Sequence, residues 1–211
     1  MKLTIFAATG GTGRQLLDQA IAAGHEVTIV VRNPSVLTRN VPTVHADLIS
    51  ADPAVLQEAV GGADAVLSAL GPRGRAEAGV VSRGTRAIID AMEATAVRRL
   101  VLVSVAGIAN PPGPGTRPVV EKALSGIANI VLHKHYADIA LMEGMLRASE
   151  LDWTSVAVPL LNDEPLTGSY RVAVGKELRK GLRLSRADVA HCMLGVLDRP
   201  DTIRQTIAAA Y

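Results

Sequence analysis

The chain has 211 residues, of which 48% are hydrophobic, a formal net charge of +2 and one cysteine, Cys192. This length favours a single domain with a full core, and one cysteine excludes both an internal disulfide and a multi-cysteine metal site. The charge is too small for a nucleic-acid-binding surface, and the five aromatic residues are too few to stack on bases. We expect neither a membrane-spanning run nor a signal peptide, and therefore a cytoplasmic protein that binds no metal.

Short apolar runs alternate with helical patterns along the chain. Strands are expected at residues 2–6, 26–31, 42–46, 63–69, 99–103 and 153–158, with an edge strand at 206–210. Helices are expected at 12–23, 53–60, 76–96, 119–150 and 186–198. Such alternation implies right-handed βαβ crossovers and a parallel sheet. We therefore predict an α/β fold over residues 1–211, a Rossmann-like doubly wound sheet in three αβα layers.

A glycine-rich turn joins the first strand to the first helix, with Ala7-Ala8-Thr9-Gly10-Gly11-Thr12-Gly13 as its sequence. Such a turn exposes N–H groups at the positive end of the helix dipole, where a pyrophosphate can bind. Gly10 lets the backbone approach phosphate, and Gly13 lets the helix pack closely against the strand. Ala7 replaces the first glycine of the usual pattern, and we expect it to hold the turn with a negative φ. A structural turn without a ligand is the alternative.

The end of the second strand indicates which dinucleotide would bind. An acid at this position would bind the ribose 2′-hydroxyl, but the sequence has Arg32. An arginine can pair with a 2′-phosphate, which favours NADP(H) and leaves NAD(H) possible. The alternative is an exposed loop arginine.

Residues after the third and fourth strands complete the expected cofactor site. Asp47 and Leu48 would lie at the adenine edge, where the carboxylate could accept from the adenine amino group. Leu70 and Gly71 end the fourth strand, and the glycine would allow close approach of sugar and phosphate. Arg73 could meet phosphate or substrate, or be exposed to solvent.

The residues available for chemistry narrow the type of reaction. Reductases of simple carbonyls use a Tyr-x-x-x-Lys pair as proton donor, and this chain has no such pair. Ser104, at the end of the fifth strand, is expected either to face the substrate or to cap a turn. A flavin, quinone or tetrapyrrole delocalises charge when reduced and needs no such donor. The sequence thus fits hydride transfer to a conjugated acceptor, and equally a protein that binds NADP without chemistry.

Other segments carry weaker signals. The Pro- and Gly-rich run 110–115 is expected to form a loop over the active site, or else a linker. A basic stretch over residues 176–186 is expected to be solvated, with attraction of an anionic cofactor as the alternative. Ser185 should cap the last helix, with Asp188 at its third position. Cys192 is expected to be buried and inert.

These motifs resemble the atypical short-chain dehydrogenase/reductase group that binds NAD(P)H, which includes the NmrA-like proteins, and most of all its flavin and biliverdin-IXβ reductase branch. The resemblance rests on residues 7–13, 26–32, 103–104, 146–149 and 163–170. It implies NADPH as hydride donor, a flavin or tetrapyrrole as substrate, and a monomer, with a weak homodimer left open as the alternative.

Site residues carried over by position agree with those above. The resemblance places Gly10, Thr12 and Gly13 at the pyrophosphate and Arg32 at the 2′-phosphate, and Gly11 of the same turn is also expected to bind the cofactor. It also places Ser104 beside the nicotinamide, with Pro159 lining the same region. Leu160 stands where the branch has a histidine, and Val36 where it has a second arginine, which favours a flavin over biliverdin. A non-catalytic redox sensor of the NmrA-like type remains the alternative.

Overall fold

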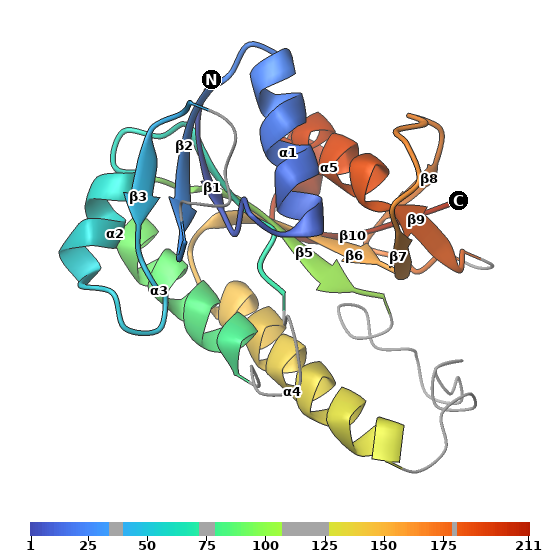
Figure 1. Cartoon of the computed structure of the whole chain (residues 1–211). Coiled ribbons are helices and arrows are strands. Elements are labelled where there is room, and N and C mark those ends of the chain that lie inside the picture. Colours follow the sequence, from blue (N-terminus) through green and yellow to red (C-terminus); the bar gives the residue numbers. More distant parts are fainter. Residues whose placement is uncertain (34–39, 72–78, 107–126, 179–180) are drawn as a thin grey trace.

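The computed structural model describes residues 1–33, 40–71, 79–106, 127–178 and 181–211 (Figure 1). The described helices are α1 (Gly11–Ala22), α2 (Pro53–Val60), α3 (Val80–Ala94), α4 (Ile127–Ala148) and α5 (Arg186–Gly195), followed by a short 3₁₀ helix at Pro200–Thr202. The described strands are β1 (Lys2–Phe6), β2 (Glu26–Val31), β3 (Thr43–His45), β4 (Ala65–Ser68), β5 (Arg99–Val105), β6 (Asp152–Val158), β7 (Leu160–Asn162), β8 (Arg171–Val174), β9 (Arg183–Ser185) and β10 (Gln205–Ala210). The run 110–115, expected as a loop over the site, lies outside the described residues.

The main sheet has eight strands in the order β3-β2-β1-β4-β5-β6-β10-β8. Its strands run parallel except β8, which pairs antiparallel with β10. From β1 the chain winds outward to β3, and from β4 it winds the other way to β6, so the winding direction reverses between β1 and β4. The predicted doubly wound parallel sheet is therefore confirmed, and ligands of such sheets bind at this reversal point.

Two short-strand features differ from the sequence-based prediction. The strand expected at the edge, residues 206–210, is β10, and it lies between β6 and β8. The edge prediction is wrong because β8, a half-exposed strand of four residues, covers the outer side of β10. In addition, β7 and β9 form a separate parallel pair that the sequence pattern did not indicate.

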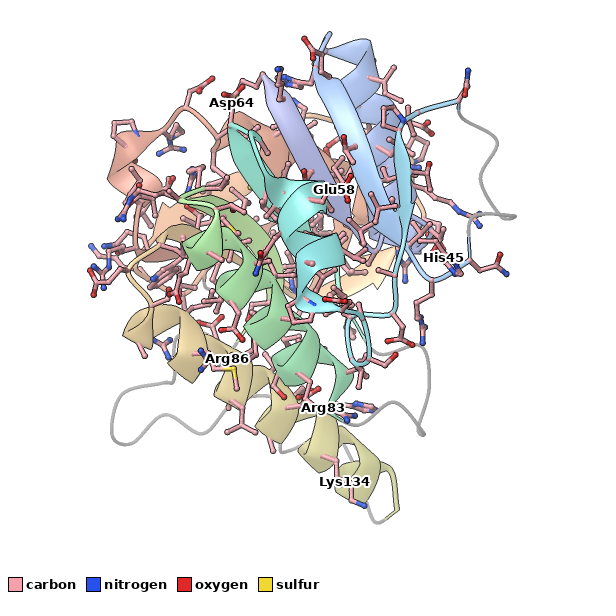
Figure 2. The ribbon with its side chains drawn as sticks, turned by 90° about the vertical axis from the view of Figure 1, so that its left-hand side faces the viewer. His45, Glu58, Asp64, Arg83, Arg86 and Lys134 are labelled. Atoms are coloured by element: carbon pink, nitrogen blue, oxygen red, sulfur yellow. The ribbon has the colours of Figure 1, made fainter. Side chains whose placement is uncertain are left out.

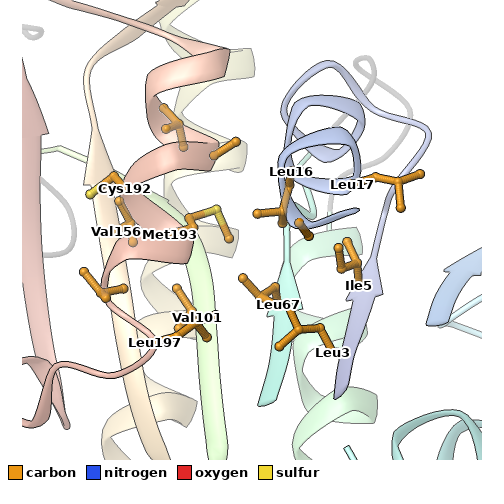
Figure 3. Packing of buried hydrophobic residues seen from close by; sticks show 14 of the residues in the cluster. Leu3, Ile5, Leu16, Leu17, Leu67, Val101, Val156, Cys192, Met193 and Leu197 are labelled. Atoms are coloured by element: carbon orange, nitrogen blue, oxygen red, sulfur yellow. The ribbon is translucent and has the colours of Figure 1, made fainter. Parts of the chain in front are cut away.

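Helices cover both faces of the sheet (Figure 1), which confirms the three layers. One face packs against α1 and α5, where Leu16 and Leu17 lie over Leu3 and Ile5 of β1 (Figure 3). Phe6 points to the other face, against α2, α3 and α4. This split follows from the strand geometry, because successive side chains point to opposite faces. Within the described ranges, no helix has both the length and the apolar character that crossing a membrane requires.

Three helix ends have clear local causes. Gly24 and Gly62 follow α1 and α2 and adopt left-handed backbone angles, with φ of 79° and 75°, which stop the helices. Ser185 accepts a hydrogen bond from the Asp188 backbone N–H at 3.0 Å, as expected of a helix cap. The sequence and the structure therefore agree on where α5 begins.

Candidate dinucleotide-binding site

The candidate site lies at the carboxyl ends of β1 and β4. These strands are neighbours, with Phe6 paired to Ser68, and the Ala69 N–H donates to the Phe6 carbonyl at 3.2 Å. The loops that follow both strands therefore leave the sheet at one place, where α1 begins (Figure 1). This is the edge at which open α/β sheets bind their ligands.

The turn between β1 and α1 is tighter than the sequence suggests. Ala7 has a φ of 60°, so the expected negative φ is wrong. A left-handed alanine costs roughly 1–2 kcal/mol, which the turn must offset elsewhere. One compensating bond is the Gly10 N–H, which donates to the Ala7 carbonyl at 3.0 Å. The same carbonyl oxygen would lie 2.1 Å from a Cβ at Gly13, so only glycine fits there.

The first turn of α1 has no side-chain acceptor for its N–H groups, whereas the starts of α2, α3 and α5 each have one. Asp52 caps α2, Ser185 caps α5, and Asp138 reaches across from α4 to accept two N–H groups of α3 at 3.0 Å each. The cap residue of α1 is Gly10, which offers no side-chain acceptor, and the first turn contains no acid. The N–H groups at Gly11, Thr12 and Gly13 and the positive dipole end are therefore suited to an anionic ligand.

Basic side chains stand at the ends of two neighbouring strands, Arg32 after β2 and His45 at the end of β3. Arg32 is exposed directly after the strand. Its carbonyl accepts a hydrogen bond from Nε2 of His45, at the end of β3, whose side chain projects from the sheet edge (Figure 2). His45 was not predicted as a site residue from the sequence. The parallel register that pairs Val31 with His45 could have revealed it.

Leu48 and Leu70, two residues of the predicted cofactor site, lie together on α3. A Cβ placed at Gly84 would meet Leu70 Cδ2 at 2.5 Å and Leu48 Cδ1 at 3.3 Å, so both leucines pack onto this glycine. The Asp47 carboxylate accepts from the Ile49 N–H at 3.0 Å, which fixes one of its oxygens within a local turn. The sequence analysis missed Gly84, although a glycine inside an amphipathic helix pattern often marks close packing.

The loop after β4 is only partly described. A Cβ placed at Gly71 would meet no atom of the described residues within 4 Å. Arg73 lies outside the described residues.

The carboxyl ends of β5 and β6 hold the residues expected at the reacting end. Ser104 lies within β5, is 2% exposed, and its hydroxyl has no hydrogen-bond partner among the described residues. A turn-capping role is therefore not supported, and an unpaired buried hydroxyl is unfavourable unless a ligand satisfies it. Ala106 donates to the Val158 carbonyl at 3.0 Å, which ties the two strand ends together. Pro159 follows directly and is half-buried, so it lies at the same edge as Ser104.

The segment after β7 is anchored by a buried carboxylate. Asp188 is fully buried and accepts bonds from Tyr211 Oη at 2.6 Å, Gly168 N at 2.8 Å, Thr167 Oγ1 at 2.9 Å and Ser185 Oγ at 3.0 Å. Burial alone would raise the pKa of Asp188, but these hydrogen bonds outweigh it and lower the pKa. The sequence analysis identified Asp188 only as part of a helix cap. Its wider role in holding residues 167–168 was missed.

The side chain of Arg186 reaches from α5 to the start of α1. A Cβ placed at Gly11 would meet its Cδ at 2.6 Å and its Nε at 2.8 Å. The guanidinium pairs with the exposed Asp163 carboxylate at 2.7 Å. In the sequence analysis this arginine belonged to a basic stretch that was expected to be solvated, but it is only 31% exposed.

Cys192 lies in α5 and packs in the core beneath the sheet face (Figure 3). Burial raises the pKa of its thiol to about 11, so the thiolate needed for reactivity is scarce near neutral pH. The expected burial of this cysteine is confirmed, and the raised pKa of its thiol supports the expectation that it is inert.

The doubly wound sheet and the uncapped glycine turn define a dinucleotide-binding α/β protein of the Rossmann type. Residues 7–200 match the sequence model of the NAD(P)H-binding family, and the chain belongs to that family. This agrees with the resemblance to atypical short-chain dehydrogenases/reductases stated above.

Known relatives match this chain over nearly its whole length. YwnB of Bacillus subtilis, an uncharacterized protein, is 34% identical, over 95% of this chain and 94% of its own length. A crystal structure from Burkholderia pseudomallei, named as a candidate exported protein, covers both chains fully at 29% identity and a TM-score of 0.81. SP1627 of Streptococcus pneumoniae, named as a candidate NADH-flavin reductase, has the same TM-score at 23% identity and covers 100% of this chain and 99% of its own.

Proposed function

We propose that the protein is an NADPH-dependent oxidoreductase that transfers hydride to a flavin or a similar conjugated acceptor, such as a quinone or a tetrapyrrole. The observation that carries this proposal is the uncapped first turn of α1 beside the carboxyl ends of β1 and β4. This arrangement suits a pyrophosphate and belongs to a family that binds NAD(P)H.

Arg32 supports the preference for NADPH. It follows β2 directly, and a guanidinium at this place can pair with a 2′-phosphate. The name of SP1627 instead specifies NADH, so the two cofactors need to be compared directly. NADH remains the second possible donor.

A conjugated acceptor is supported by what stands at the reacting end. Bound NADPH supplies a hydride, and a proton from water completes the reduction of the acceptor. The chain has no Tyr-x-x-x-Lys pair to protonate a simple alkoxide. The unpaired hydroxyl of Ser104 can instead donate to a heteroatom of the acceptor and so orient the acceptor's ring against the nicotinamide.

The test is oxidation of NADPH by FMN, riboflavin and a quinone, with NADH compared at equal concentration. Ser104→Ala should lower turnover about 10-fold, since it removes one orienting hydrogen bond, and leave the Kd for NADPH unchanged. Ser149→Ala is the matched control, because this buried hydroxyl bonds the Leu146 carbonyl at the end of α4. Equal turnover in both variants would remove Ser104 from the reaction.

The second candidate is a non-catalytic NADP(H)-binding redox sensor of the NmrA-like type. The missing Tyr-x-x-x-Lys pair favours it as much as it favours a flavin reductase. Tight NADPH binding without turnover of any acceptor would support the sensor and overturn the reductase.

We also propose that the protein acts in the cytoplasm as a monomer or weak homodimer and binds neither nucleic acid nor membranes. Its single cysteine is buried and needs no oxidising compartment, and its net charge of +2 offers little to a polyanion. The name of the Burkholderia protein points to export instead, so cell fractionation is the deciding measurement.

A further inference from the structure

Arg186 occupies an electrostatically unfavourable place. It is the first residue of α5, and its side chain lies against Gly11, the first residue of α1. Both helix ends carry partial positive charge, which favours anions and disfavours a guanidinium. The arginine therefore lies where two helix dipoles repel it, and its position calls for a compensating anion.

Among the described residues, the carboxylate that pairs with Arg186 is too weak a partner to explain the position of the guanidinium. Asp163 pairs with the guanidinium at 2.7 Å, but its side chain is 85% exposed. An ion pair with so exposed a partner contributes little to stability, because water screens it. Asp188 is the nearest acid along α5. Its carboxylate oxygens already accept hydrogen bonds from Tyr211, Thr167, Gly168 and Ser185.

The backbone holds Arg186 in place on both sides. Ser185 caps α5 directly before it, through the Asp188 N–H at 3.0 Å. The Ala187 carbonyl directly after it accepts from Gln19 Nε2 of α1 at 2.9 Å. The start of α5 is thus fastened to α1. The backbone therefore holds the guanidinium of Arg186 close to the glycine turn.

We propose that Arg186 binds the pyrophosphate of the dinucleotide from the α5 side, opposite the N–H groups of α1. The guanidinium exchanges the Asp163 carboxylate for the phosphate oxygens when the cofactor enters. A planar guanidinium suits this role, because it can donate two parallel bonds to one phosphate. The inference rests on the proposed cofactor site and adds to it a residue outside the glycine turn.

The exchange also links the cofactor to the segment that follows β7. Asp163 begins this segment, and residues 167–168 are fastened to α5 by Asp188. Release of Asp163 would free the near end of the segment while its far end stays fixed. Cofactor binding would thereby loosen residues 163–166, which lie between β7, held by its pairing with β9, and the fastened Thr167.

The experiment measures the Kd of Arg186→Met for NADPH, ADP-ribose and adenosine 2′-monophosphate by calorimetry. The Kd for NADPH and ADP-ribose should rise about 10-fold or more, because one charge-assisted contact to the pyrophosphate is lost. The Kd for adenosine 2′-monophosphate should not change, since this compound lacks a pyrophosphate. Arg199→Met is the matched control, since it removes an equal charge and an ion pair, to Asp201, beyond the other end of α5.

Asp163→Asn separates ligand binding from a purely structural ion pair. It should bind NADPH up to about 5-fold more tightly, since the free guanidinium no longer has a competing anion, and have no effect in the Arg186→Met background. The inference is overturned if Asp163→Asn weakens NADPH binding as Arg186→Met does, or if Arg186→Met matches Arg199→Met. If the unmodified protein binds no dinucleotide at all, both the proposed function and the inference on Arg186 are wrong.

Discussion

At the scale of single residues, Gly13 sets how closely α1 approaches β1. Any Cβ at this position would lie 2.1 Å from the Ala7 carbonyl oxygen, which is backbone and cannot swing aside. Gly13→Ala should therefore push α1 away from the turn, abolish NADPH binding, and destabilise the fold by about 2 kcal/mol or more. Calorimetry and urea unfolding measure the two effects.

Gly144→Ala is the control for this prediction. It lies inside α4, and a Cβ there would meet no described atom within 4 Å. The same substitution should stabilise that helix by about 0.5–1 kcal/mol and leave binding unchanged. If Gly13→Ala bound NADPH as tightly as Gly144→Ala, the glycine turn would not be the pyrophosphate site.

The residue scale also shows where sequence reasoning succeeds and fails. The need for glycine at position 13 was predictable, since the spacing of the loop motif carries it. The left-handed φ of Ala7 was not, because alanine ordinarily avoids that region and only the closed turn imposes it. The packing of Leu48 and Leu70 on Gly84 depends equally on tertiary contacts.

At the scale of elements, two buried acids hold parts of the chain that are distant in sequence. Asp138 of α4 caps α3, and Asp188 of α5 holds residues 167–168 and the C-terminal Tyr211. The Ser185 cap was predicted because both partners are close in sequence. The contacts of Asp138 and Asp188 to other elements were not, since they depend on how helices and loops dock.

The lowered pKa of Asp188 makes this anchor sensitive to acid. Because the pKa is lower in the folded state, the carboxylate's stabilising contribution is present above its unfolded pKa of about 4 and is lost as the pH falls through the folded value. Asp188→Asn should cost about 2 kcal/mol or more at neutral pH, because an amide cannot accept all these bonds. The variant should also lose part of this acid dependence.

The free energy of unfolding of the unmodified protein and of Asp188→Asn, measured in urea between neutral pH and about pH 3, checks the prediction. Asp201→Asn is the control, since Asp201 is exposed, pairs with Arg199, and should matter little. An unchanged slope of stability against pH in Asp188→Asn would mean that its charge is not what anchors the segment.

At the scale of the whole molecule, the layered fold was predictable and its far edge was not. The alternation of strands and helices predicted the parallel sheet, and the glycine turn located its crevice. The short strands β7, β8 and β9 have at most four residues each, too few for a clear period, so β10 was expected at the edge. Ser104 was predicted from its place after apolar residues of β5. Arg186 could not be predicted as a site residue, because its position beside the glycine turn depends on the packing of α5 on α1.

Because the site joins two strands and two helices, ligand binding should stabilise the whole molecule. At 100 times its Kd, NADPH contributes about 2.7 kcal/mol, which should raise the Tm by roughly 5–10 °C for a domain of this size. At equal concentration NADH should raise it less, since it lacks the 2′-phosphate that Arg32 would bind. Arg32→Asp should abolish this difference or reverse it, because a carboxylate repels the phosphate and accepts from a ribose hydroxyl.

Thermal unfolding with each cofactor, on the unmodified protein and on Arg32→Asp, measures both effects together. Arg98→Asp is the control, because Arg98 pairs with Asp152 at the start of β6, the opposite end of the strand from Pro159. This variant is expected to have a lower Tm without cofactor and to keep the larger shift with NADPH. Equal shifts of the Tm with NADPH and NADH in the unmodified protein would mean that the 2′-phosphate is not recognised. Both dinucleotides would then be assigned as hydride donors.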